Sequence, residues 1–249
     1  MTLELASASA MALPEWEPGA HIDVVLSTGQ VGKFALCGSL VQTHGWRIAV
    51  AGGSEGDQGP DWVQEHAHPG SELRIRGPHN DFPLHPASLY LFVAYGIGIA
   101  SVLPMIARAE AYGADRTLRY GGRSRSSMPF LSELLGYRER VVVWPEDQYG
   151  PPGITGFLGD PDPSMLVYCC GPGELLAAVR EHCAAWPLGA LQLRESTAWP
   201  ACPGEEAELT AGSPGIAELD LESASTPRHG RHTQTPRNAQ EQRSTGAST

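Results

Sequence analysis

Glycines stand where three apolar stretches of the sequence end, and such bends can hold a phosphate or a carboxamide. The first bend is "YGIGIAS", in which Gly96 and Gly98 follow the apolar run "LYLFVA" and precede a helical pattern. Glycine lets another group approach the backbone and permits positive φ, and the free N–H groups of the helix that follows favour an anion. A G-x-G pair is also typical of a tight turn without a ligand, so this stretch alone leaves both interpretations open.

Two further bends repeat this arrangement. "YGGRSRSS" places Arg123 beside Ser124 at the end of a predicted strand, and guanidinium and hydroxyl donors suit a phosphate or a ribose. The alternative for this stretch is a solvated basic loop. "YCCGPGELL" passes from a strand through Cys170, Gly171 and Pro172 into a helix, and Pro172 suits a first helical turn. Cys170 either faces a ligand there or packs inertly.

Alternating strands and helices must position these bends. The patterns predict strands over 89–94, 116–121, 140–144, 165–170 and 190–194, and helices over 101–113, 128–136 and 173–186. We expect Pro104 to kink or delay the first of these helices. Such alternation predicts a mostly parallel, five-stranded sheet covered on both faces. Ligands of these sheets bind beyond the carboxyl ends of the strands.

The regions on either side have a different character. Short strands punctuated by Gly, Pro, Ser and Asp are predicted over 20–26, 31–37, 46–52 and 71–77, which indicates a small antiparallel barrel or sandwich. The end of the chain is rich in Ser, Thr, Gly, Pro and Gln and cannot bury enough apolar surface to offset its ordering entropy. We therefore predict a β-barrel domain over 1–86, an α/β domain over 87–195 and a disordered tail over 196–249.

Composition limits the classes of function. The chain has 249 residues and a formal net charge of −11, which argues against binding to nucleic acid or to an anionic membrane. No apolar run reaches the roughly 20 residues that span a bilayer, and the N-terminus does not read as a signal peptide. The cysteines are odd in number and lack metal-type spacing, namely Cys37, Cys169, Cys170, Cys183 and Cys202. A reduced, cytoplasmic protein is expected.

Seven stretches occur in an order that carries a family resemblance: "EPGAHIDVVL", "FALCGS", "WRIAVAGG", "LRIRGPHNDFPL", "YGIGIA", "YGGRSR" and "YCCGP". Over about residues 12–195 the chain resembles the ferredoxin reductase-like oxidoreductases, and in particular the reductase components of Rieske oxygenases of the phthalate dioxygenase reductase and vanillate demethylase reductase type. The resemblance implies an N-terminal flavin-binding antiparallel barrel followed by a parallel NAD-binding domain. It also implies electron transfer from NADH through FMN (or FAD) to an external acceptor, a ferredoxin or a Rieske-type oxygenase.

The resemblance also implies where the cofactors bind, without a catalytic acid or base, because the cofactors carry the chemistry. Nicotinamide and pyrophosphate are expected along 96–99, the adenosine end at 122–124, the nicotinamide ring near 170–172 and the flavin ring beside 34–37. The predicted cofactor-binding residues are Lys33, Phe34, Ala35, Leu36, Cys37, Gly59, Asn80, Gly96, Ile97, Gly98, Ile99, Gly122, Arg123, Ser124, Cys170, Gly171 and Pro172.

The flavin half departs from the family pattern. The family has Arg-x-Tyr-Ser where this chain has Gly32, Lys33, Phe34 and Ala35, so the arginine that pairs with the flavin phosphate is absent and Lys33 is a partial substitute. In "GPDWVQEH", Pro60 and Gln64 replace a serine and a histidine of the phosphate loop. A charge-assisted hydrogen bond is worth about 1.5–3 kcal/mol, so we predict a weakened flavin-phosphate site. Asn80 and Phe82 of a further motif are kept.

Two other departures lie in the second half. Tyr95 stands at a glycine of the family pattern, and Ala100 and Ser101 replace its Thr-Pro pair. A plant-type [2Fe–2S] cluster needs C-x₄-C-x₂-C and a distant fourth cysteine. Because only Cys202 follows Ser196, we expect no such cluster in this chain, whose end reads as truncated or frame-shifted.

These observations leave two hypotheses. The first is an NADH-dependent flavin oxidoreductase. The second is a catalytically silent or truncated relative that keeps the scaffold as a binding module, and the lost phosphate ligands motivate it. No tyrosine–lysine or histidine–carboxylate pair supports a third class, hydride transfer from nicotinamide directly to a carbonyl. The choice between NADH and NADPH stays open, because Arg123 could accept a 2′-phosphate.

Overall fold

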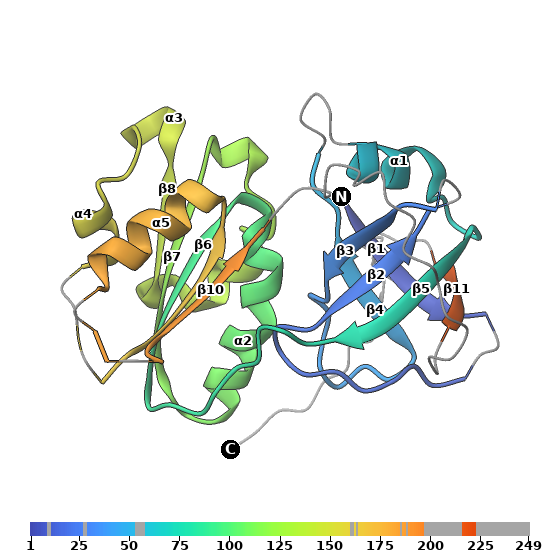
Figure 1. Cartoon of the computed structure of the whole chain (residues 1–249), viewed down its shortest axis with the longest axis horizontal. Helices are drawn as coiled ribbons and strands as arrows, with labels where there is room; N and C mark the ends of the chain where they lie inside the picture. The colour runs from blue at the N-terminus through green and yellow to red at the C-terminus, as the bar shows by residue number, and fades with distance from the viewer. Residues whose placement is uncertain are drawn as a thin grey trace, which may run out of the picture.

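A computed structural model of the chain describes residues 1–8, 11–26, 29–52, 58–159, 162, 164–184, 186–187, 189–196 and 216–222. Within these residues the chain forms two β-sheets that lie side by side (Figure 1). One sheet is antiparallel and the other is parallel. Both sheet types predicted from the sequence are confirmed, whereas the boundaries predicted for the domains stay a prediction.

The antiparallel sheet forms the barrel. Its strands are β1 (Thr2–Ser7), β2 (His21–Val25), β3 (Val31–Ala35), β4 (Gly45–Ala49), β5 (Glu72–His79) and β11 (Ile216–Glu222), in the order β3-β2-β5-β11-β1-β4. A bridge between Leu36 and Ile48 joins the two ends of this order and closes the sheet. Alternate residues of the strands point inward, and Ile22, Trp46 and Ile75 are among the fully buried side chains of the core.

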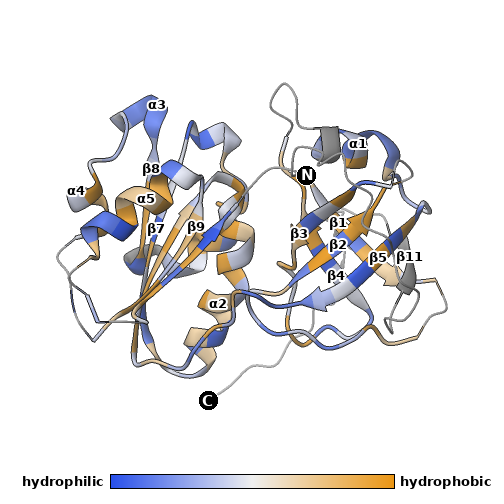
Figure 2. Ribbon diagram, viewed as in Figure 1, coloured by the Kyte–Doolittle hydropathy of each residue, from blue (hydrophilic) through white to orange (hydrophobic). Residues whose placement is uncertain are grey.

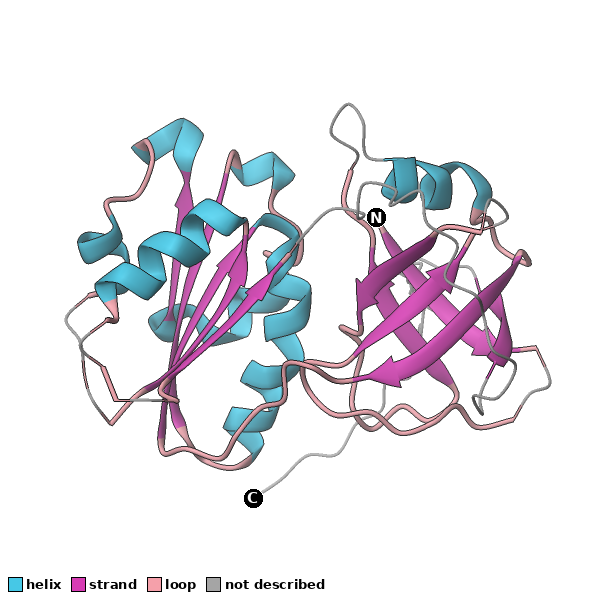
Figure 3. Ribbon diagram, in the orientation of Figure 1, coloured by secondary structure: helices cyan, strands magenta, loops and turns pink. Residues whose placement is uncertain are grey.

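The parallel sheet consists of β6 (Leu89–Tyr95), β7 (Asp115–Gly122), β8 (Val141–Pro145), β9 (Leu166–Gly171) and β10 (Leu191–Glu195), in the order β10-β9-β6-β7-β8. Helices cover both of its faces (Figure 3). Helix α2 (Ile99–Ala111) lies on the side of the barrel, and α4 (Ile154–Leu158) and α5 (Gly173–His182) lie on the other side. Strand β6 is central and almost continuously apolar, as a strand buried on both faces must be (Figure 2).

The remaining elements are short. They are α1 (Gln58–His66), α3 (Glu146–Tyr149) and the 3₁₀ segments η1 (Gly96–Gly98), η2 (Arg125–Ser127) and η3 (Glu133–Arg140). The first strand, β1, and helix α1 were not predicted from the sequence. No helix among the described residues is long and apolar enough to cross a membrane.

One local prediction is wrong and another is wrong in part. The segment 128–136 is not an α-helix: its start is irregular and its end enters η3. Met128 is extended, with φ −91° and ψ 109°, because the residue before a proline is disfavoured in the helical region and Pro129 follows. Pro104 does not delay helix α2, which begins at Ile99 and continues through Pro104. The other expected effect, a kink at Pro104, stays a prediction.

The predicted disordered tail differs from the structure in one segment. Residues Ile216–Glu222 form β11, which pairs antiparallel with β1 on one side and with β5 on the other. The stretch "IAELDLE" alternates apolar and acidic residues with the period of a strand, and composition averaged over the tail conceals that pattern. The other residues of the predicted tail beyond Ser196 lie outside the described ranges.

Candidate functional site

The three predicted bends lie at one edge of the parallel sheet. Ala94 pairs with Cys170 and Tyr95 pairs with Gly121, so the ends of β6, β9 and β7 are in register. Residues from these ends line a cleft of about 2160 Å³ between the parallel sheet and the barrel. The barrel contributes Lys33, Phe34 and Ala35 of β3 to the same cleft. Pockets for one small molecule usually measure about 300–1,000 Å³, so this cleft has room for more than one ligand.

The glycines at the first bend serve two different purposes. Gly96 has φ +53°, and nothing lies within 4 Å of the position that a Cβ would take there. It therefore turns the chain and leaves its face of the cleft open. A Cβ at Gly98 would lie 2.2 Å from the carbonyl oxygen of Cys170, so Gly98 is required by close packing against β9.

The glycines at the other two bends lie against side chains of the protein. A Cβ at Gly122 would lie 2.5 Å from Cγ of Met128, and one at Gly171 would lie 2.8 Å from Cδ2 of Leu175. Neither glycine lines the cleft. The bare backbone at these two strand ends is thus occupied by side chains of the protein itself.

The cleft brings together about half of the residues predicted to bind cofactors. Those that line it are Lys33, Phe34, Ala35, Gly96, Ile97, Gly98, Arg123, Cys170 and Pro172. Those that do not line it are Leu36, Cys37, Asn80, Ile99, Gly122, Ser124 and Gly171. Gly59 lies in helix α1.

Asn80 has a clear structural task. Its amide donates to the carbonyl of Pro18 at 3.1 Å, and its side-chain oxygen accepts from the backbone N–H of Phe82 at 3.0 Å. These two bonds fix the loop between β5 and β6 against the barrel. Its role as a cofactor ligand stays a prediction.

Arg123 and Arg125 are both exposed at the second bend, and Arg123 is the one that faces the cleft. It lines the cleft, together with Ser126 and Ser127. The hydroxyl of Ser124 is occupied locally, because it caps η2 by accepting from the backbone N–H of Ser127 at 3.3 Å. The hydroxyl of Ser127 is also occupied, because it donates to the carbonyl of Ser124 at 2.9 Å. The guanidinium of Arg123 and the hydroxyl of Ser126 are therefore the donors that this bend offers to an anion or a ribose.

Tyr95 crosses the strand ends between the first and second bends. Its ring atom Cδ2 lies 3.0 Å from the position of a Cβ on Gly121, and both Tyr95 and Glu146 line the cleft. Burial, followed by a hydrogen bond to the Glu146 carboxylate, raises the pKa of Tyr95 to about 12. The tyrosine is thus neutral near pH 7 and is held toward the end of β8.

Tyr120 supports the Gly96 turn, and the sequence did not indicate this role. It is fully buried on β7. Its hydroxyl lies within donating distance of two carbonyl oxygens, that of Gly96 at 3.2 Å and that of Pro129 at 3.0 Å. One phenol therefore links the first bend to the loop after the second. Only a side-chain contact reveals such a link, because 24 residues separate Tyr120 from Gly96.

The two cysteines nearest the cleft are neutral. Burial raises the pKa of the Cys170 thiol to about 11, although a hydrogen bond with Ser101 opposes the shift. Burial also raises the pKa of Cys37 to about 12. A thiolate is the nucleophilic form of cysteine, so neither residue suits covalent catalysis. Among the described residues no cluster of His, Cys, Asp or Glu could hold a metal ion.

The flavin half of the cleft fits a planar ring better than a phosphate. Phe34 is 6% exposed and its ring belongs to the core of the barrel, and Ala35 is small, so β3 offers the cleft a low wall with Lys33 as its charged side chain. Near its end, Pro60 lacks an N–H, and the amide of Gln64 donates to the carbonyl of Ala51 instead of facing the cleft. The exposed amine of Lys33 is the cation that this wall offers to a phosphate. The residues present therefore fit a nicotinamide and a flavin ring, with few donors for the flavin phosphate.

Comparison with known proteins identifies relatives in oxygenase systems. No family model matches the chain. The chain is 34% identical to the vanillate O-demethylase oxidoreductase of Pseudomonas putida over 188 residues, which are 74% of this chain and 59% of that protein. The chain spans about three fifths of the length of the first curated relatives that it matches.

Solved structures show the same arrangement of sheets. An intact type IV self-sufficient cytochrome P450 monooxygenase matches with a TM-score of 0.74 and 36% identity, over 78% of this chain and 26% of that one. Phthalate dioxygenase reductase, described as a modular structure for electron transfer from pyridine nucleotides to [2Fe–2S], matches with a TM-score of 0.72 and 28% identity, over 78% of this chain and 62% of that one.

Proposed function

The chain belongs to the ferredoxin reductase-like family of oxidoreductases, and on that premise we propose that it is the nicotinamide- and flavin-binding module of an oxygenase reductase. It takes reducing equivalents from NADH and delivers them to an external acceptor, a ferredoxin or a Rieske-type oxygenase. The observation that carries this proposal is the shared cleft, in which the ends of β6, β7 and β9 face strand β3 of the barrel.

The proposal assigns the parallel-sheet side of the cleft to the dinucleotide. The open turn at Gly96 receives the nicotinamide and pyrophosphate portion, and Arg123 with Ser126 holds the adenosine end. Helix α2 begins at Ile99, so its N-terminal N–H groups favour a phosphate near the turn. The neutral thiol of Cys170 adds no charge beside the nicotinamide ring.

The barrel side is assigned to FMN or FAD. The end of strand β3, at Phe34 and Ala35, lies along the flavin ring and excludes water from one of its faces, and Lys33 pairs with the phosphate. A flavin held there would supply hydride acceptance and single-electron release, which is chemistry that no side chain supplies. The contribution of the chain is alignment of the two rings.

Spectroscopy of the purified full chain tests this proposal. FMN is titrated into the protein, and binding is followed by quenching of flavin fluorescence and by calorimetry. NADH is then added without oxygen, and we expect the visible flavin absorption to bleach and ferricyanide to be reduced. Protein that binds neither FMN nor FAD and shows no NADH-dependent reduction of ferricyanide would contradict the proposal.

The second candidate function is a catalytically silent binding module. The small number of phosphate donors on the barrel side of the cleft favours it. Substitution of four residues together, Gly32→Arg, Phe34→Tyr, Ala35→Ser and Pro60→Ser, returns the family's ligands to that wall. If the parent chain binds no flavin and this variant does, the parent is a silent relative that lost its ligands only. Flavin binding by the parent chain removes this candidate.

A further inference from the structure

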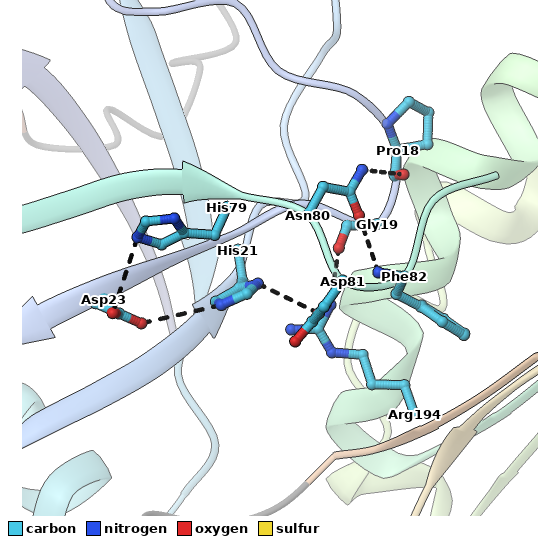
Figure 4. Close-up of polar contacts among 9 residues, drawn as sticks. All are labelled: Pro18, Gly19, His21, Asp23, His79, Asn80, Asp81, Phe82 and Arg194. Atoms are coloured by element: carbon cyan, nitrogen blue, oxygen red, sulfur yellow. Dashed lines mark hydrogen bonds and ion pairs between the residues drawn. The ribbon is translucent and has the colours of Figure 1, made fainter.

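Arg194 reaches from the parallel sheet to the barrel. It is the fourth residue of β10 and pairs in register with Cys170 of β9, so it stands at the edge of the sheet that forms the cleft. Its Nη1 donates to the carbonyl of Gly19 at 2.7 Å and lies 3.3 Å from Oδ1 of Asp81 (Figure 4). The guanidinium also lies 5.9 Å from the ring centroid of Phe82. One side chain of β10 therefore contacts both the segment before β2 and the connection between β5 and β6.

Arg47 reaches in the opposite direction. It lies on β4 of the barrel and binds Glu133 with both nitrogens of its fork, Nη1 to Oε1 at 3.1 Å and Nη2 to Oε2 at 2.8 Å. Nη2 also donates to the carbonyl of Cys37 at 2.9 Å, and the guanidinium lies 5.3 Å from the ring centroid of Phe130. Glu133 and Phe130 belong to the segment that follows the second bend of the parallel sheet.

The two arginines share several features. Each is mostly buried, with side-chain exposures of 24% for Arg47 and 16% for Arg194. Each pairs with a carboxylate, donates to a backbone carbonyl and lies over a phenylalanine ring, and each lines the cleft. A bidentate arginine–carboxylate pair fixes geometry as well as adding energy, and a planar guanidinium loses less freedom on binding than a flexible amine.

We propose that Arg47 and Arg194 are positioning residues that fix the spacing of the cleft from its two sides. Arg194 fixes the ends of β9 and β10 against the barrel loops, and Arg47 fixes the barrel against the segment after β7. Neither arginine is placed as a ligand of either cofactor. They act through the walls, one of which carries Phe34 and the other Gly96.

The positioning role of the two arginines does not depend on the proposed function. Only its expected effect on the rate of hydride transfer rests on that function. Hydride transfer needs reacting atoms about 3–3.5 Å apart, and a misplacement of about 1 Å can cost about a hundredfold in rate. Substitution of one arginine leaves the contacts of the other in place, so we expect a smaller decrease in the rate of hydride transfer, about tenfold. Binding of each cofactor to its own wall depends little on the spacing, so the dissociation constant of NADH should change less than threefold.

The test compares Arg47→Gln and Arg194→Gln with a matched control, Arg108→Gln. Arg108 of helix α2 also pairs with a barrel carboxylate, Glu17, at 3.6 Å, but neither residue lines the cleft. Each variant is loaded with FMN, and the rate of flavin bleaching by NADH is measured by stopped flow over a range of NADH concentrations. We expect the limiting rate to fall about tenfold in the first two variants and to stay unchanged in the control.

Hydrogen exchange of the flavin-free chain supplies a readout that does not depend on activity. We expect Arg194→Gln to increase exchange several-fold in 79–88, and Arg47→Gln to do so in 128–140, with parental exchange in β6. Adding Glu133→Gln to Arg47→Gln should cause no further change, because both substitutions remove the same contact. Lysine at either position should restore part of the rate, since it keeps the charge without the fork.

The outcomes separate this proposal from the proposed function. If Arg47→Gln and Arg194→Gln match Arg108→Gln in hydrogen exchange, the two arginines do not fix the spacing and the proposal is overturned. If NADH bleaches no flavin in the parent chain, the proposed function is wrong. The hydrogen-exchange measurement alone then tests the positioning role of Arg47 and Arg194. Equal increases in exchange throughout the chain would also overturn it, because they indicate general destabilisation.

Discussion

At the residue scale, the strand ends show how one residue type meets different needs. Gly96 has positive φ and open space beside it, whereas Gly98 packs against the carbonyl of Cys170. A substitution at Gly98 would force backbone apart, whereas one at Gly96 would strain the turn and fill the cleft. The two positions therefore fail for different reasons, although the sequence presents them as one motif.

Tyr95 carries a prediction about nucleotide binding. A dinucleotide that spans Gly96 and Arg123 passes over the tyrosine ring and must displace it from Glu146. A hydrogen bond contributes about 1 kcal/mol net, which corresponds to about fivefold in affinity. We expect Tyr95→Gly to tighten NADH binding at least fivefold, measured by energy transfer from protein tryptophan to bound NADH.

The control for this prediction is Tyr95→Phe, which keeps the ring and removes the hydroxyl. We expect its NADH affinity to lie between those of the parent and the glycine variant. Weaker binding by Tyr95→Gly would contradict the prediction, since it would show that the ring stacks on the nucleotide.

Single residues were predictable from the sequence when they belong to a contiguous motif. Gly96, Arg123 and Cys170 line one cleft as expected, because parallel strands bring their carboxyl ends to one edge. Arg47 and Arg194 could not be recognised, because their partners lie 86 and 175 residues away. Isolated arginines carry no signal until the fold brings their partners within reach.

At the element scale, some strands and helices could be predicted from their own sequences, whereas others depend on pairing with distant segments. Every strand of the parallel sheet was predicted from the sequence. Strands β6 and β9 are apolar throughout, as strands buried on both faces are, whereas β7 and β10 contain arginines and were predicted from the alternation of strands and helices. Helix α1 was not predicted because its sequence, "QGPDWVQEH", has a glycine and a proline among its first three residues and contains few apolar residues. Strand β11 was not predicted because the stretches around it resemble a polar tail.

Strand β11 carries a prediction about stability. It has a neighbour on each side, with Leu219 opposite Ser7 of β1 and Leu73 of β5. Proline at position 219 would remove an N–H from the ladder and leave a carbonyl unpaired, at a cost of about 1–3 kcal/mol. We expect Leu219→Pro to lower the melting temperature by about 2–4 °C for each kcal/mol lost, as measured by circular dichroism.

Shortened chains provide the control for β11. A chain that ends at Glu222 keeps the strand and should melt with the parent. One that ends at Ser196 removes it and should melt at least as early as Leu219→Pro. If all three variants melt with the parent, β11 does not contribute to the stability of the barrel.

At the scale of the whole molecule, the contact between barrel and parallel sheet contains a buried histidine. His21 is 2% exposed, and its Nδ1 lies 3.6 Å from Asp81, the carboxylate that Arg194 also contacts (Figure 4). Burial lowers the pKa of His21, and the positive charge of Arg194 lowers it further, against the attraction of Asp81 and Asp23. The folded protein thus holds this imidazole neutral near pH 7.

A dependence of stability on pH follows. Below the ordinary histidine pKa of about 6.5, the unfolded chain takes up a proton that folded His21 resists. The unfolded state then binds more protons, so the free energy of unfolding falls as pH falls from about 6.5 to the lowered pKa, and this contribution levels off below it. We expect His21→Asn to flatten that portion of the profile, measured by urea unfolding at a series of pH values. A profile equally steep in His21→Asn and in the parent would contradict the assignment.

The position of β11 also determines when the barrel can be completed during synthesis on the ribosome. Domains usually fold in the order in which they are translated, but here the barrel includes both Thr2–Ser7 and Ile216–Glu222. The nascent barrel therefore leaves β1 and β5 unjoined while the parallel sheet is made and folded. The half that is synthesised first is completed last, and until then it exposes two unprotected strand edges to chaperones and to neighbouring chains.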